Sequence, residues 1–364
     1  MRTAIVLGLL LASGCGFPPA GATAGPPEPG PMPHLVDLYG DPLPTGAIAR
    51  FGSVRLRHAN LSDFTLLPDK RTAVTVGGDG MVRWWDWKTG RQTRAVPFQG
   101  KDFWNLTISR DGSQIAFYEP DGEARIVVCD TLTGRIIQTL TSHGSAEDLS
   151  FSPDGSTLAF GAKASRLTRV TIRTGKSAET QFGTPHDQHF GPFLPPLSIS
   201  FSQDGKRIVA GGIHGDDHTA EVIDAVDLQR VFAVPGKLQA QALSPDGTRL
   251  IVYPAWQEGS KSAPLLREYD LKTGKPIDRF SIEIEDECTS IAYSLDGKFL
   301  VCTDWGSAQV LDAVTGKVRI RVPQFGQAKI SADGGLLAVA DGPRLRLWDV
   351  ANGRELHNRP GAIH

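Results

Sequence analysis

The sequence predicts an all-β protein in which one four-stranded unit occurs seven times, and three observations support this prediction. An Asp-Gly turn recurs after a short alternating strand. From Asp69 to Asp333 this turn has six intervals over 264 residues, a mean period of 44 residues. The 40 Gly and 25 Pro in 364 residues indicate many turns between short elements. A period of this size is typical of repeat architectures.

The first turn of the unit has six regular copies and one degenerate copy. The degenerate copy is Leu67-Pro-Asp-Lys70, in which Lys replaces Gly. Gly adopts the positive φ of such a turn without steric cost. The regular copies are Ser109-Arg-Asp-Gly112, Ser152-Pro-Asp-Gly155, Ser202-Gln-Asp-Gly205, Ser244-Pro-Asp-Gly247, Ser294-Leu-Asp-Gly297 and Ser331-Ala-Asp-Gly334.

A second turn, Gly followed by Arg or Lys, occurs in six of the seven units, after a hydrophobic strand. The fourth unit has Leu228 at this place. Each unit therefore contains four strands, with the Asp-Gly turn after the first strand and this turn after the third. The glycines are Gly90, Gly134, Gly175, Gly274, Gly316 and Gly353.

The first strand of each unit has one apolar and one small face. Large, mainly apolar residues stand three positions before the turn Asp, and small residues stand four before it in six units. The small position is Thr65, Thr107, Ser150, Ser200, Ala242, Ala292 and, in the last unit, Lys329. Such alternation predicts half-buried strands, and small side chains suit the crowded axis of a radial array.

The repeats fill the chain after its N-terminal region. Seven units of 44 residues need 308 residues, and the span from Ser53 to Arg354 supplies 302. We therefore expect one domain over 46–354, without room for a second, and a tail over 355–364.

The repeats resemble those of the WD-repeat family. The residues that carry the resemblance are the Ser-x-Asp-Gly turns and the strand ends Trp85-Asp86 and Trp348-Asp349. The resemblance implies a seven-bladed β-propeller of four-stranded antiparallel blades. It also places Asp79, Asp121 and Asp341 at the aspartate of the family's buried His–Asp network, although the family's Gly-His dipeptide is mostly missing.

The resemblance also implies how the ring closes. Residues 53–58 alternate like an outer strand and are expected to pair with the C-terminal blade, 327–350. Closure removes exposed sheet edges, which otherwise favour aggregation. Glu355-Leu-His can compete for the same edge.

The N-terminus is interpreted as an export signal over residues 1–14. Its apolar run of nine residues is too short to span a bilayer. Ala12-Ser13-Gly14-Cys15 resembles the lipobox of bacterial lipoproteins, which predicts a lipid on Cys15. The alternative is cleavage after Ala24. Residues 15–45 hold nine prolines and are expected to form an extended tether.

Composition excludes several functions. The net charge is −2 and the chain has no run of Lys or Arg, which argues against a nucleic-acid partner. No nucleophile elbow, phosphate loop or dinucleotide turn is present. We expect no cofactor and a monomeric domain.

Four histidines gather on two loops that one rim is expected to carry. They are His186 and His189 in the loop before the fourth unit, and His214 and His218 within that unit. With Asp216, they are candidate ligands for zinc or another divalent ion. The alternative interpretation is a pair of solvated polar loops.

Two tryptophans are candidate partner-binding residues, because Trp is enriched at binding hot spots. They are Trp104, at the start of a first strand, and Trp256, in a long loop of the fifth unit. The predicted contact surface is the rim of loops 183–197, 212–219 and 254–264, together with the four histidines. A polar channel entrance is predicted from Asp63, Asn105, Asp148, Ser198, Ser290 and Gln327.

Cys288 and Cys302 flank the first hairpin of the sixth unit, so they are a candidate disulfide in an exported protein.

The function that these observations favour is a non-catalytic scaffold of the cell envelope that binds an unidentified protein or peptide. It would touch the membrane only through its N-terminal lipid. The alternative is an extracytoplasmic propeller enzyme, a metal-assisted hydrolase or lactonase, that uses the His/Asp loops.

Overall fold

The structure is a computed structural model of the chain. It describes residues 36–37, 41–43, 47, 54–120, 124–142, 146, 148–162, 166–181, 198–214, 217–234, 238–254, 265–283, 288–304, 306–323 and 326–357. For residues 162, 212–214, 217–219, 239 and 278–283 it describes the backbone alone. It divides into two compact units, Met1–Ser53 and Val54–His364.

The second unit consists of four-stranded sheets, each built from consecutive strands. The first contains β1 (Leu61–Leu66), β2 (Thr72–Gly77), β3 (Met81–Asp86) and β4 (Arg91–Pro97). The second contains β5 (Trp104–Ile108), β6 (Gln114–Glu119), β7 (Arg125–Asp130) and β8 (Ile136–Thr141). The third contains β9 (Asp148–Phe151), β10 (Thr157–Ala162), β11 (Arg166–Thr171) and β12 (Ser177–Gln181).

The remaining four sheets follow the same order. The fourth contains β13 (Ile199–Phe201), β14 (Arg207–His214), β15 (Asp217–Asp224) and β16 (Arg230–Val234). The fifth contains β17 (Leu238–Leu243), β18 (Arg249–Pro254), β19 (Leu265–Asp270) and β20 (Pro276–Glu283). The sixth contains β21 (Ser290–Tyr293), β22 (Phe299–Thr303), β23 (Ser307–Asp312) and β24 (Val318–Pro323). The seventh contains β25 (Ala328–Ile330), β26 (Leu336–Asp341), β27 (Arg344–Asp349) and β28 (Glu355–Leu356).

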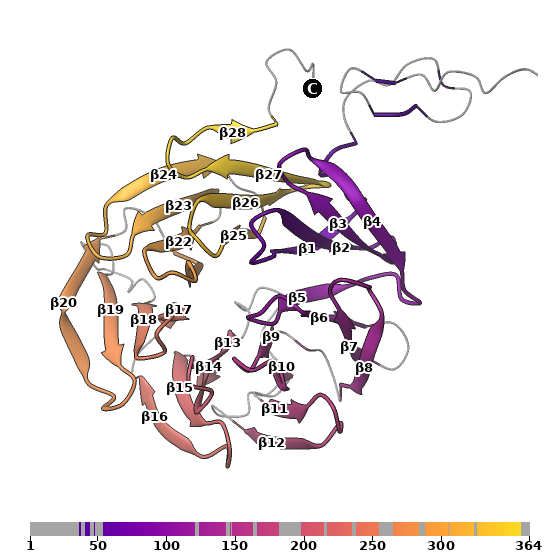
Figure 1. Cartoon of the computed structure of the whole chain (residues 1–364). Coiled ribbons are helices and arrows are strands. Elements are labelled where there is room, and N and C mark those ends of the chain that lie inside the picture. Colours follow the sequence, from indigo (N-terminus) through magenta and orange to yellow (C-terminus); the bar gives the residue numbers. More distant parts are fainter. Residues whose placement is uncertain are drawn as a thin grey trace, which may run out of the picture. The chain divides into compact units, whose positions relative to one another are not determined.

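The seven sheets are the blades of a ring, with the first strand of each blade nearest the centre (Figure 1). All paired strands within the blades are antiparallel. The predicted all-β, seven-bladed β-propeller is therefore confirmed. Within the described residues, no helix is long and apolar enough to span a membrane.

The turns have the backbone that the repeat predicts. The glycine of the Asp-Gly turn has a φ of 67–75° in its six copies, and the glycine of the second turn has 68–72°. The two units without glycine keep the same conformation, with a φ of 56° at Lys70 and 58° at Leu228. These turns therefore place L-residues in a region that Gly occupies without strain.

A hydrogen-bond network closes each regular Asp-Gly turn. In the third blade, the hydroxyl of Ser152 donates to Asp154 Oδ1 at 2.6 Å and accepts from the amide of Thr157 at 2.9 Å. The serines of the other five copies also donate to their turn aspartates. In the degenerate first copy, Asp69 accepts directly from the amides of Arg71 and Thr72.

Apolar layers between neighbouring blades form the core. Between the first two blades, Trp84 packs with Phe103 and Phe117, which are fully buried, and with Cys129. An equivalent layer joins the seventh blade to the first and contains Leu56, Phe64, Trp85 and Leu347. Burial of apolar side chains between neighbouring blades therefore holds the ring together.

Both ends of the propeller chain pair with one edge of β27. Arg57 forms a bridge with Arg344, the His58 amide donates to the Pro343 carbonyl at 2.8 Å, and the Leu345 amide donates to the Leu56 carbonyl at 2.9 Å. The predicted closure by the N-terminal segment is therefore present. Farther along the same edge, Glu355–Leu356 forms β28, so these two residues belong to the seventh blade and not to the expected tail.

The first compact unit, Met1–Ser53, is described only at a few residues. Val36 and Pro42 form an isolated bridge, and the Asp37 amide donates to the Asp41 carbonyl at 2.8 Å. The predicted signal peptide, Cys15 and the cleavage site after Ala24 lie outside the described residues.

Candidate functional site at the central channel

A cavity of about 590 Å³ runs along the axis of the propeller, lined by the first strands of the blades. The small position identified in the sequence lines it in all seven blades. Four of its members are hydroxyl residues, two are alanines and one is Lys329. Small side chains at this position leave the axis open, as the sequence predicts.

Lys329 is the one large side chain at the position that is small in the other six blades, and it bridges the last blade to the first. Its ammonium lies 2.8 Å from Asp63 Oδ1 and 3.3 Å from the Leu106 carbonyl, and 5.4 Å from the centre of the Phe64 ring. The side chain of Asp63 is almost fully buried, whereas that of Lys329 keeps 32% exposure. An ion pair with one buried partner depends strongly on both members, because either charge alone is poorly solvated.

Two predicted entrance residues use their carboxylates to join neighbouring blades. Asp63 Oδ2 accepts from the amide of Leu106 in the second blade at 2.6 Å. Asp148 Oδ2 accepts from the amide of Ile199 in the fourth blade at 2.6 Å, and its Oδ1 accepts from its neighbour Leu149 at 2.8 Å. Both acids therefore position the inner strands, and Asp148 also lines the channel.

Asp148 has an unusual protonation equilibrium. Desolvation raises its pKa to about 7, against the effect of the two backbone amides and of the positive charge on Lys329. Near neutral pH the channel therefore changes charge at this residue.

The other predicted entrance residues have different outcomes. Asn105 has a φ of 55° and donates from Nδ2 to the Ala146 carbonyl at 2.5 Å, again across a blade boundary. Ser198 and Ser290 line the cavity, and Gln327 is not among its lining residues. Three of the six predicted residues, Asp148, Ser198 and Ser290, therefore line the cavity, whereas Asp63 and Asn105 do not line it and bond across blade boundaries instead.

Trp104 is exposed at the start of β5, with 53% of its surface accessible. It is paired with Tyr118 on β6. Phe98, Phe103 and Phe117 form an aromatic cluster beside this strand, with ring centroids 5.0–6.0 Å apart. A large apolar surface is therefore presented to solvent on a rigid strand.

The predicted histidine loops mostly lie outside the described residues. His186, His189 and Asp216 are not described, nor is Trp256. His214 and His218 lie on β14 and β15, opposite Asp217 and Ile213 respectively. These strands run to His214 and from Asp217, so most of the expected loop 212–219 is a hairpin. Among the side chains that the structure describes, no group of His, Cys, Asp or Glu is arranged to hold a metal ion.

Cys288 and Cys302 are both buried thiols in one core cluster. The strand register places Cys302 opposite Ile291. The neighbouring Cys288 and burial raise the pKa of Cys302 well above its usual value. A bridge between the two cysteines stays a prediction.

A buried polar network lies between β1–β3 and the segment that precedes them. His58 joins Thr75 Oγ1 through Nδ1 at 2.7 Å and Asp79 Oδ1 through Nε2 at 2.9 Å. The indole of Trp85 donates to the same hydroxyl at 2.8 Å. Burial lowers the pKa of His58, although the hydrogen bond with Asp79 opposes this effect. Asp79 thus has the role that the sequence resemblance gave it, whereas Asp341 pairs with Arg346 and Asp121 is not described.

Comparison with known proteins finds partial sequence matches. The chain is 25% identical over 167 residues to eukaryotic translation initiation factor 3 subunit I of Culex quinquefasciatus, covering 44% of this chain and 50% of that protein. It is 29% identical over 110 residues to the WD repeat-containing protein SL1-17 of Schistosoma mansoni, covering 30% of this chain and 36% of that protein. The repeats are similar to those of a WD repeat-containing protein.

The WD-type match is partial in length. The chain spans about half the length or less of these relatives, including the 45% that it matches in the initiation factor subunit of Bombyx mori. No family model matches the chain. A chain in the crystal structure of the mitotic checkpoint complex has the same fold, with a TM-score of 0.62, 16% identity and coverage of 82% of this chain and 92% of that chain.

Two features of this propeller were not identified from the sequence. The role of His58 was missed because the histidine precedes the first complete repeat and lacks the preceding glycine of the family dipeptide. The ion pair of Lys329 was missed because its partner is 266 residues away. The sequence feature that could have indicated this ion pair is the lysine itself, because the other six units have a small residue at its position.

Proposed function

We propose that this propeller is a non-catalytic scaffold that binds a protein or peptide through the surface around its channel entrance. The observation that carries the proposal is Trp104, which is half exposed on a strand supported by packed aromatic rings. A rigid aromatic side chain loses little conformational entropy on binding, and such residues often dominate interface energies.

The relatives support this proposal by their descriptions. One is described as a subunit of a translation initiation factor, and a subunit binds other chains of its assembly. We extend only the mode of action to this chain, a WD-type propeller that acts through protein contacts.

The location that we propose is the cell envelope, with the chain anchored by a lipid on Cys15. The apolar N-terminal run and the lipobox-like sequence before Cys15 support it. Mass spectrometry of the mature N-terminus tests it: a diacylated Cys15 is expected, and an unmodified N-terminus at Gly25 would show cleavage after Ala24 instead.

Affinity capture from envelope extracts tests the scaffold. The wild-type chain is expected to retain a partner whose yield drops at least about tenfold with Trp104→Ala, because hot-spot residues contribute 2 kcal/mol or more. Deletion of 254–264, the loop with Trp256, provides a second variant on the predicted surface.

The control is Trp87→Ala, which removes a tryptophan from a turn at the opposite end of its blade. Equal partner recovery with wild type, Trp104→Ala and the loop deletion would exclude this surface as the binding site.

A further inference from the structure

A second surface lies at the opposite end of the propeller, where the third strand of each blade turns into the fourth. Strands alternate in direction within a blade, so these turns and the Asp-Gly turns lie at the same end of the ring, opposite the end at which the first strands begin and Asp148 lines the channel. We call the seven third-to-fourth-strand turns the turn rim. Because the blades repeat around one axis, the turn rim forms a nearly flat circle.

The third strand of each blade ends in an aspartate, or in Thr171 in the third blade, and the residue two positions after this strand end is exposed in all seven blades. Its chemistry alternates around the ring. Blades two, four and six carry aliphatic side chains, the aliphatic tips: Leu132, Val226 and Val314, with 81%, 74% and 77% exposure. Blades one, three and five carry the cationic tips: Lys88, Arg173 and Lys272. The seventh blade has Ala351.

The aliphatic tips are the most exposed large apolar side chains among the described residues. Further exposed aliphatic residues follow them on the fourth strands of the same three blades: Ile136, Ile137, Val231 and Val318, each 44–49% exposed. Single exposed apolar residues are ordinary on protein surfaces. Here they occupy one repeated position in alternate blades, which scattered exposure does not produce.

Neighbouring blades hold two of these turns in place. Arg94 of the first blade donates to the carbonyl of Leu132 in the second. Arg169 of the third blade donates to the carbonyl of Ala225, beside Val226 in the fourth, at 2.6 Å. Leu132 and Val226 therefore project from turns that a neighbouring blade holds, so little ordering is needed when they bind.

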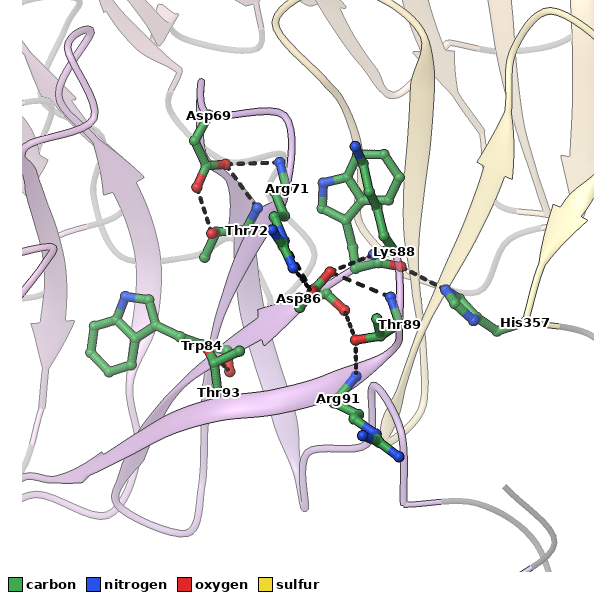
Figure 2. A network of polar contacts seen from close by, with 11 residues as sticks. Asp69, Arg71, Thr72, Trp84, Asp86, Lys88, Thr89, Arg91, Thr93 and His357 are labelled. Atoms are coloured by element: carbon green, nitrogen blue, oxygen red, sulfur yellow. Dashed lines mark hydrogen bonds and ion pairs between the residues drawn. The ribbon is translucent and has the colours of Figure 1, made fainter. Parts of the chain in front are cut away.

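The negative charges of the turn rim are mostly directed into their own turns. Asp86 accepts from the amides of Lys88 and Thr89 and pairs with Arg71, as Figure 2 shows. Amide and hydroxyl donors of Thr315, with Arg319, lower the pKa of Asp312 to about 2. Among the aspartates of the turn rim, Asp227 alone is exposed. The Asp-Gly turns at the same end of the ring add one exposed aspartate in each blade, and six of these aspartates accept a hydrogen bond from the serine of their own turn.

The cations of the turn rim face solvent. No carboxylate among the described residues lies within ion-pair distance of the cationic tips. In six blades the residue after the glycine of the third-to-fourth-strand turn is a further exposed cation. These residues are Arg91, Arg135, Lys176, Lys275, Lys317 and Arg354.

We propose that the turn rim docks on an anionic lipid surface, with the aliphatic tips inserted among headgroups that the cationic tips bind. A flat circle of points matches a planar bilayer, and aliphatic side chains interleaved with cations match its interface. A protein partner is a poorer match, because protein hot spots cluster at the centre of one patch, and these tips lie on three separate blades.

Vesicle co-sedimentation tests the proposal on the full chain carrying Cys15→Ser, so that no lipid at this cysteine contributes. We expect binding to vesicles of phosphatidylcholine mixed with phosphatidylglycerol, weakening as salt is raised, and much weaker binding to phosphatidylcholine alone. Absence of binding to the anionic vesicles would overturn the proposal.

Two triple variants separate the contributions. Leu132→Ser with Val226→Ser and Val314→Ser removes the aliphatic tips, and Lys88→Gln with Arg173→Gln and Lys272→Gln removes the cationic tips. Each is expected to weaken binding to the anionic vesicles by about tenfold or more, because a surface cation contributes roughly fivefold and buried apolar area adds to it. The matched control is Val54→Ser with Leu265→Ser, two exposed aliphatic residues outside the turn rim.

A second measurement reports insertion directly. Val226→Cys, labelled with an environment-sensitive fluorophore in the same background, is expected to shift to the blue when anionic vesicles are added. The described native cysteines are buried, so they do not compete for the label in the folded protein. An unshifted spectrum with bound vesicles, or a tip variant that binds like the control, would rule out the turn rim as the docking surface. Loss of a captured protein partner with unchanged vesicle binding would identify it as a protein interface instead.

Discussion

The Lys329–Asp63 pair shows how a single residue departs from a repeat to serve the whole ring. Six blades place a small side chain at this position, and the seventh places an ammonium between two blades. The buried Asp63 also receives the Leu106 amide, so it joins three segments of chain.

Removing the lysine is expected to destabilise the fold. Lys329→Met leaves the buried Asp63 carboxylate without its cation, and about 2–3 kcal/mol of unfolding free energy should be lost, less than for a fully buried pair. Asp63→Asn with Lys329→Met is expected to cost at least about 1 kcal/mol less than the sum of the single changes. Urea denaturation of the four proteins measures this coupling, and additive effects would contradict it.

Asp148 is expected to give stability a distinctive pH dependence. Its pKa is about 7 in the folded protein and about 3.9 when unfolded. The folded state therefore binds more protons between these values, so its stability falls as pH rises from about 4 to about 7 and is level above.

The comparison of wild type with Asp148→Asn isolates this effect. The effect of Asp148 must be measured as the difference in stability between the two proteins. The lowered pKa of His58 makes the stability of both proteins rise with pH below pH 6.5, which opposes the effect of Asp148. Thermal unfolding across this pH range is expected to show wild type losing stability relative to the variant as pH rises. A constant difference would contradict the raised pKa.

At the scale of the element, the turns show how much of the repeat depends on backbone conformation. Twelve turn glycines have positive φ, and Lys70 and Leu228 keep that conformation in the units that lack glycine. The neighbouring strands thus impose the turn on whichever residue stands there.

Two substitutions at this turn position are expected to change the free energy of unfolding differently. Gly155→Ala, at a φ of 69°, should lower unfolding free energy by about 1 kcal/mol. Lys70→Gly relieves the equivalent strain and loses an exposed ion pair with Asp333, so stability should stay the same or rise by up to about 1 kcal/mol. Chemical denaturation measures both. A loss for Lys70→Gly equal to that for Gly155→Ala would show that the cross-blade pair outweighs the strain.

The repeated elements could be predicted because their signals are local. The Asp-Gly turn, the second turn and the alternating first strand each lie within a few residues, so their period indicates the blades. The extension of β14 and β15 could not be predicted, because a polar Gly-rich segment such as His214–His218 is compatible with a loop or a hairpin. The channel site was predicted in part: polar entrance residues follow from the repeat register, whereas their partners lie on other blades.

At the scale of the whole molecule, closure is shared between the two ends of the propeller chain. Leu56–His58 and Glu355–Leu356 divide one edge of β27, and His357 reaches the Trp87 carbonyl of the first blade at 2.6 Å (Figure 2). The sequence indicated both segments as competitors for this edge, and the structure accommodates both side by side.

The two segments are expected to contribute unequally. Leu56 is buried in the apolar layer between the seventh and first blades, so Leu56→Ala should cost about 2–4 kcal/mol. A chain ending at Arg354 loses a two-residue strand, the ion pair of Glu355 with Arg346, the partly buried Leu356 and the contact of His357 with the Trp87 carbonyl. These groups are less buried than Leu56, so the shortened chain should lose less. Calorimetry of both proteins measures the difference, and a larger loss for the shortened chain would assign closure mainly to β28.

The pairing of Leu56–His58 with Pro343–Leu345 also has a consequence in time. A ribosome makes the N-terminal segment first, and its backbone partner Pro343 follows His58 by 285 residues. At about 5–20 residues per second, that segment waits for roughly 15 to 60 seconds. Throughout that interval the first blades are an open arc with two unprotected flanks. The incomplete ring therefore needs protection by a chaperone while the remaining blades are synthesised. A chain that stops before the last blade lacks the partner of Leu56–His58 and cannot close the ring.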